Sequence, residues 1–169
     1  MDVDELQHAL GGVVLESAYL ERVLRLSFSA LVGSKYAAVV DGRLMASALI
    51  ADCEQLTRYH TDLPSADKQG LHAALRACHE ANRERNRVIH DTWATRPGNV
   101  MVTLRTDGTS HEVTVTARTL AEVRDLAQKI AASAEGLKSA MTAAFGPGWD
   151  LMEDRLRQEL GHDITAGQE

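Results

Sequence analysis

Apolar residues recur at steps of three and four over long stretches of this chain, and this periodicity constrains its fold more than any other feature. Over residues 3–32 the recurring residues are Val3, Leu6, Leu10, Val13, Leu20, Leu24 and Leu31. That spacing places side chains on one face of an α-helix, so the segment is predicted to form one long amphipathic helix. Ser17 interrupts this face.

The same periodicity predicts three further helices, over 43–60, 65–94 and 119–144. Thr119 and Glu122 stand three residues apart at the start of the last of these, which fits a capping box. Aromatic residues make up only 4% of the chain and there are 3 prolines, which agrees with a largely helical protein. The predicted fold class is therefore all-α.

Two stretches before the last long helix alternate apolar and polar residues instead. They cover 100–106 and 110–117 and flank Asp107-Gly108, a dipeptide typical of hairpin turns. This hairpin is the only β structure that we expect. A short helix over 149–160 is predicted to follow the last long helix.

Composition limits the class of protein. The chain has 169 residues, 44% apolar and 25% charged, so we expect one globular domain over 1–160 and a polar, disordered tail over 161–169. The formal charge of −6 excludes a protein that binds nucleic acid through an overall basic surface, but it leaves room for a local basic site.

No apolar run approaches the roughly 18 residues of a membrane span. The acidic start lacks the basic residues of a signal peptide, so a cytoplasmic protein without a membrane partner is expected.

The chain has two cysteines, Cys53 and Cys78, and both fall within predicted helices. Neither has a Cys or His neighbour at the spacing of a metal site. They are predicted to be buried, reduced thiols, and no metal or other cofactor is expected.

The helix predicted over 65–94 interrupts its own apolar stripe. Near both ends, one direction is shared by Leu71, Leu75, Cys78, Ile89 and Trp93. The middle of the stripe is filled by Asn82, Arg85 and Asn86, with His90 on its flank. Burying Arg and Asn side chains costs several kcal/mol unless each finds a partner. A helix that does so is a candidate functional site.

Two structural interpretations compete with a functional one. The three polar residues could form a structural network or a polar seam between subunits. The arginine-rich run over 83–87 could be a solvated face with helical ion pairs.

The hexapeptide Arg85-Asn86-Arg87-Val88-Ile89-His90 resembles the R-x(4–6)-H signature of the HEPN superfamily, including the polar residue that often follows the arginine. The resemblance implies an up-and-down four-helix bundle, here with a β-hairpin inserted before the last core helix and a short C-terminal helix. Many members of that superfamily are metal-independent endoribonucleases, often toxins or antiphage effectors, whose active site forms across a dimer. The implied partners are RNA and a second copy of the chain, with an antitoxin or other protein partner left open.

The resemblance implies catalytic roles for Arg85, Asn86 and His90, and the chemistry suits these residue types. An imidazole can act as base or acid near neutral pH, and a guanidinium matches phosphate oxygens. Asn86 lies four residues before His90 on the same side and could orient it or the phosphate.

Three neighbouring residues are predicted to bind substrate: Asn82, Arg83 and Arg87. One position departs from some toxin members, which carry a modifiable Tyr two residues after the histidine, where this chain has Thr92. A partner that modifies that position is therefore in doubt. The alternative functions are a non-catalytic HEPN-like module that binds nucleotide or a protein partner, and a structural helical dimer.

Overall fold

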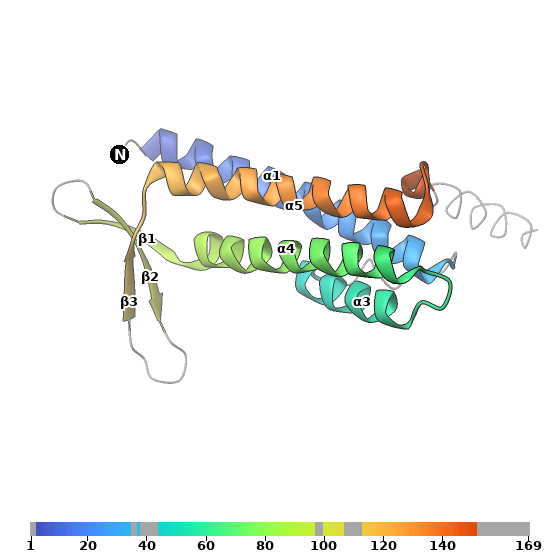
Figure 1. Ribbon diagram of the computed structural model, residues 1–169. Helices are drawn as coiled ribbons and strands as arrows, with labels where there is room; N and C mark the ends of the chain where they lie inside the picture. The colour runs from blue at the N-terminus through green and yellow to red at the C-terminus, as the bar shows by residue number, and fades with distance from the viewer. Residues whose placement is uncertain (1–2, 35–36, 38–43, 97–99, 107–112, 152–169) are drawn as a thin grey trace, which may run out of the picture.

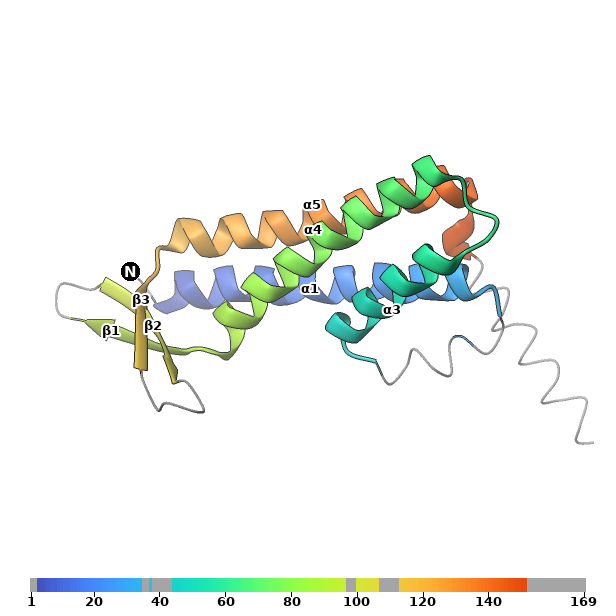
Figure 2. The same ribbon diagram turned by 60° about the horizontal axis from the view of Figure 1, so that its bottom comes forward.

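The computed structural model describes residues 3–34, 37, 44–96, 100–106 and 113–151. Four α-helices lie side by side in it (Figures 1 and 2), namely α1 (Val3–Val32), α3 (Ala46–Tyr59), α4 (Ser65–His90) and α5 (Leu120–Phe145). A single 3₁₀ turn, η1 (Trp149–Leu151), follows α5. The four predicted long helices are confirmed, although α4 ends earlier than expected. None of the described helices combines the length and the apolar character that crossing a membrane requires.

The directions of the helices differ from those of an up-and-down four-helix bundle. α1, α3 and α5 run the same general way, and α4 runs against them (Figures 1 and 2). Two hydrogen bonds agree with these directions. The Tyr19 hydroxyl of α1 donates to Glu135 of α5 at 2.6 Å, and Arg25 of α1 donates to the carbonyl of Leu44, just before α3. α3 thus begins beside Arg25, about two turns before α1 ends, and runs in the same direction, so α1 and α3 are parallel neighbours. The expectation of strict alternation was wrong here.

Three antiparallel strands stand at the end of the bundle where α4 stops and α5 begins (Figure 1). They are β1 (Thr92–Arg96), β2 (Val100–Thr106) and β3 (Val113–Ala117), in the order β1-β2-β3. The pairing of β2 with β3 confirms the predicted hairpin, but β1 shows that a hairpin as the only β structure was wrong. The turn at 107–112 lies outside the described residues.

The predicted continuation of α4 to residue 94 was wrong. The backbone becomes extended at Asp91, which has φ −74° and ψ 147°, and this ends the helix. Trp93 does not extend the helical stripe. It lies on β1, and its indole N–H donates to the carbonyl of Val88 at 2.9 Å, so the ring folds back over the last turn of α4. An ion pair between Asp91 and Arg105 of β2, at 2.7 Å, fixes the sheet to this corner.

The core lies between α4 and the helices around it. Its largest fully buried side chains include Leu24, Leu49, Leu71, Leu75, Ile130, Leu137 and Met141. The start of α5 has the predicted capping box: the Thr119 hydroxyl accepts from the Glu122 N–H, and the Glu122 carboxylate accepts from the Thr119 N–H. Beyond α5, Trp149 is buried and its indole N–H donates to Thr142 at 3.0 Å. The rest of the predicted short helix, 152–160, and the tail over 161–169 lie outside the described residues.

The two cysteines are buried as free thiols, as predicted. Burial raises the pKa of both thiols, and that of Cys78 to about 11. Since the thiolate is the reactive form, we expect both to resist a thiol-specific chromogenic reagent at pH 8 in the folded protein and to react fully after denaturation.

The direction of the Cys78 pKa shift fixes how stability depends on pH. The folded-state pKa of Cys78 lies above its ordinary value of 9.0, so the protonated thiol is favoured in the fold. Its contribution to stability is present below pH 9 and is lost as the pH rises through about 11. Thiol labelling of the folded protein should speed up over the same range, and rapid labelling at pH 8 would contradict the burial.

Candidate functional site

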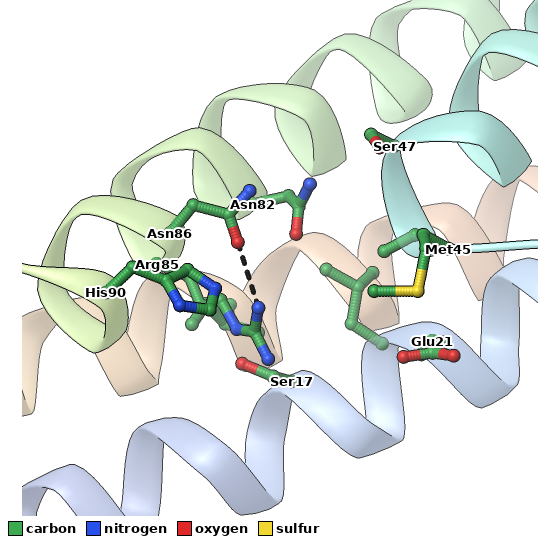
Figure 3. Close-up of a pocket in the computed structure, with 11 residues that line it drawn as sticks. Ser17, Glu21, Met45, Ser47, Asn82, Arg85, Asn86 and His90 are labelled. Carbon is green, nitrogen blue, oxygen red and sulfur yellow. Dashed lines mark hydrogen bonds between the residues drawn. The ribbon is translucent and has the colours of Figure 1, made fainter. Parts of the chain in front are cut away.

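A cavity of about 300 Å³ opens where α1, α3 and α4 meet (Figure 3). We call it the Arg85 pocket. Its lining comes from α1, from the start of α3, from α4 and from one residue of α5: Ser17, Leu20, Glu21, Met45, Ala46, Ser47, Asn82, Arg85, Asn86, His90 and Ile130. Four of the six residues predicted for the site therefore face one cavity, and they are the ones that interrupt the α4 stripe.

Helical spacing explains why four α4 residues share the pocket. Asn82, Arg85, Asn86 and His90 follow one another at steps of three, one and four, which keeps them on one side of the helix. Their exposure increases along α4: Asn82 is 8% exposed, Arg85 and Asn86 are half-buried, and His90 is exposed. Of these four residues, Asn82 is thus the most buried and His90 the most exposed; Figure 3 shows all four on α4.

Arg85 is a half-buried cation without a carboxylate partner among the described residues. One Nη donates to the Asn86 side-chain oxygen at 2.9 Å (Figure 3), while its buried Nε–H has no acceptor in the part of the chain that the structure describes. A guanidinium removed from water is costly unless its donors and its charge are matched. The pocket therefore presents unused donors and an uncompensated positive charge, which is what a bound anion would satisfy.

Glu21 is the acidic residue in the pocket, and the sequence interpretation missed it. Its carboxylate accepts from Arg25 Nη2 at 2.5 Å, and the same nitrogen donates to the Leu44 carbonyl at 3.0 Å. Arg25 therefore holds Glu21 and ties the start of α3 to α1, which places Met45 on the pocket rim. The available signal was Ser17, because Glu21 follows it by four residues on the same interrupted face of α1.

Two predicted substrate-binding residues lie outside the Arg85 pocket. Arg83 and Arg87 are both exposed on α4. Arg87 lines a different groove, between α4 and α5. Both directions follow from the helix, since Arg83 and Arg87 each follow a pocket amide by one residue and so lie about 100° further round α4, toward solvent.

The pocket combines groups for proton transfer with groups for anion binding. His90 supplies an imidazole at the mouth, Arg85 a guanidinium, and Asn82 and Asn86 supply amides that donate and accept. Within the described part of the chain, no group of three or more His, Cys, Asp or Glu side chains is placed to hold a metal ion.

Removing the Arg25 link should loosen the pocket rim. In Arg25→Ala, the Glu21 carboxylate and the Leu44 carbonyl lose a shared donor, and we expect a loss of about 1 kcal/mol of unfolding free energy in urea. Amide hydrogen exchange should speed up at 45–49, where α3 begins. Arg22→Ala, which removes an exposed guanidinium from the same helix, is the matched control. Equal exchange in the two variants would contradict the linking role of Arg25.

Comparison with known proteins gives no family for this chain. No protein-family model matches it, no curated protein matches it, and no solved structure matches it.

Proposed function

We propose that this chain is a metal-independent endoribonuclease of the HEPN type that cleaves RNA at the Arg85 pocket, in the role of a toxin or antiphage effector. The observation that carries the proposal is the half-buried Arg85 guanidinium, which has no carboxylate partner in the described part of the chain and shares one cavity with the His90 imidazole. A phosphodiester supplies the missing negative charge, and its ribose supplies a hydroxyl for the imidazole to deprotonate.

The reaction follows from these groups. The ribose 2′-hydroxyl attacks the adjacent phosphorus while the imidazole of His90 takes its proton. The bond from phosphorus to the 5′-oxygen of the next nucleotide breaks, and that oxygen receives a proton from a second acid. Arg85 donates to the non-bridging oxygens, on which charge grows in the transition state. The products are a 2′,3′-cyclic phosphate and a free 5′-hydroxyl, and the atoms balance without a metal-bound water.

The need for a second acid favours a site completed by another copy of the chain. Among the described residues, the Arg85 pocket of one protomer is lined by one imidazole, and the partner's equivalent histidine would be the second. Two features of the pocket mouth support this: His90 is exposed there, and an apolar side chain lies beside it. Met45, which lines the pocket, is 73% exposed. Exposed apolar groups beside an open pocket are typical of a surface that a partner covers.

A non-catalytic nucleotide-binding module is the second candidate. A volume of about 300 Å³ is at the lower end for small-ligand pockets, and the amides of Asn82 and Asn86 could read a base edge. A purely structural polar seam is favoured less, because a structural network would be expected to satisfy the buried Arg85 Nε–H.

Substitutions at the pocket test the proposed reaction. His90→Ala should lower kcat on single-stranded RNA by about 10² to 10⁴, the range for general acid–base catalysis. Arg85→Ala should lower it by about 10² to 10³, because charge stabilisation in the transition state is lost. Asn86→Ala should cost less, since an amide carries neither a charge nor a transferable proton.

Controls separate the reaction from contamination. His8→Ala and Arg58→Ala remove exposed side chains on α1 and α3 and should keep wild-type rates. RNA with 2′-deoxyribose at the scissile position should resist cleavage, and EDTA should change nothing. Activity that persists in His90→Ala, or that disappears with EDTA, would assign the reaction elsewhere. An absence of cleavage in the wild-type protein would favour the binding module.

Assembly is tested separately. Light scattering at micromolar concentration should give twice the mass of the 18.4 kDa chain. Met45→Glu should shift the protein to a monomer and reduce cleavage, because a carboxylate would be buried in the contact. Ser65→Glu, a charge added at the exposed start of α4, is the control. A wild-type monomer with full activity would contradict the composite site.

A further inference from the structure

A second groove lies along α4 on the side away from the Arg85 pocket. It has a volume of about 400 Å³ and lies between the C-terminal half of α4 and the first turns of α5: its lining is Glu84, Arg87, Val88, Arg118, Glu122, Val123, Asp125, Leu126 and Lys129. We call it the Arg118 groove. It shares no residue with the Arg85 pocket.

Of the three carboxylates that line this groove, one is in an ion pair and a second accepts a backbone hydrogen bond. The Glu84 carboxylate pairs with Lys129 at 2.7 Å. The Glu122 carboxylate accepts from the Thr119 N–H at 2.7 Å, at the N-terminus of α5, where the helix dipole favours negative charge. Asp125 is exposed and has no ion pair among the described residues.

The two arginines of the groove have donors to spare. Neither Arg87 nor Arg118 pairs with a carboxylate in the described part of the chain, and the Nε–H of Arg118 is buried without an acceptor. The main chain at Arg118 is anchored, since its N–H donates to the Met101 carbonyl of β2 at 3.0 Å. The groove therefore has a guanidinium with a buried, unused donor among the described residues, and a second guanidinium in the same lining.

The exposed face of α4 connects the groove to the pocket. From Arg76 to His90 the exposed residues are Arg76, Ala77, His79, Glu80, Arg83, Arg87 and His90. With histidines neutral, that is three positive charges and one negative, a local charge of +2 on a chain whose net charge is −6. At about 100° per residue, Arg83 and Arg87 lie on the arc between His90, at the pocket mouth, and the Arg118 groove.

We propose that the Arg118 groove is a second phosphate-binding site, in which Arg87 and Arg118 hold a backbone phosphate of the same single-stranded RNA whose scissile phosphate lies in the Arg85 pocket. The identity of that strand rests on the proposed function. A guanidinium fork matches phosphate oxygens, and a row of arginines along one helix face is a footprint of phosphate-backbone binding. An acidic protein is favoured less, because the row leads to a pocket that holds an imidazole.

Binding to RNA that resists cleavage tests this site without requiring catalysis. The probes are a fluorescent single-stranded 12-mer with 2′-O-methyl riboses and a dinucleotide of the same chemistry, which is too short to pass round a helix about 10–12 Å across. By fluorescence anisotropy, Arg118→Ala should weaken 12-mer binding about tenfold and leave dinucleotide binding unchanged. The slope of log K against log salt should fall by about 0.7, the value for one phosphate contact on a single strand.

Two variants keep the result interpretable. Arg118→Lys retains the charge without the fork, so it should keep the salt slope and recover only part of the affinity, even if Arg118→Ala folds poorly. Arg58→Ala, an exposed arginine on α3, should change nothing. If Arg118→Ala is folded and binds the 12-mer like wild type, or if no oligonucleotide binds, the second site is overturned. If the 12-mer binds through Arg118 but wild type cleaves no RNA, the strand-binding site stands and the nuclease proposal fails.

Discussion

Burial of the α4 stripe is the constraint on which the rest of the structure depends. Leu71, Leu75 and Cys78 are completely buried, and this side of α4 packs against α3 and α5, with a smaller contact to α1. At about 25 cal/mol per Å² of apolar surface removed from water, the burial of this stripe makes a large contribution to stability.

The same constraint makes the polar interruption informative. A buried helix face has little tolerance for an arginine, yet Arg85 stands where the stripe should continue, and its Nε–H has no acceptor among the described residues. Arg25 contributes from the other side by holding Glu21, the carboxylate among the described residues that line the Arg85 pocket, in an ion pair. Two features thus leave the positive charge of Arg85 free to bind an anion. The pocket face of α4 carries no carboxylate among its described residues, and the carboxylate of Glu21 is paired with Arg25.

The corner between α4, the sheet and α5 was the part of the fold that local pattern predicted least well. Trp93 has the helical spacing of the α4 stripe, so periodicity alone extended the helix through it. Thr92 and Trp93 are of residue types that favour strands, and β1 forms because β2 offers it a partner, with Thr92 opposite Leu104. Such pairing depends on residues distant in sequence, which a periodicity within one segment does not report. The capping box at Thr119, in contrast, involves residues three apart and was predicted correctly.

The sequence by itself determined the long helices and the gathering of Asn82, Arg85, Asn86 and His90 on one face, because 3.6 residues per turn decides both. It also determined that Arg83 and Arg87 lie on other faces, although the sequence interpretation grouped all six residues as one site. Only the tertiary structure decided which residues of other elements lie against those faces of α4. Glu21 and Met45 lie against the face with Arg85, and Arg118 lies against the face with Arg87. The physical reason is that these contacts depend on the order and direction in which the helices pack, and that is set by the burial of all four stripes together.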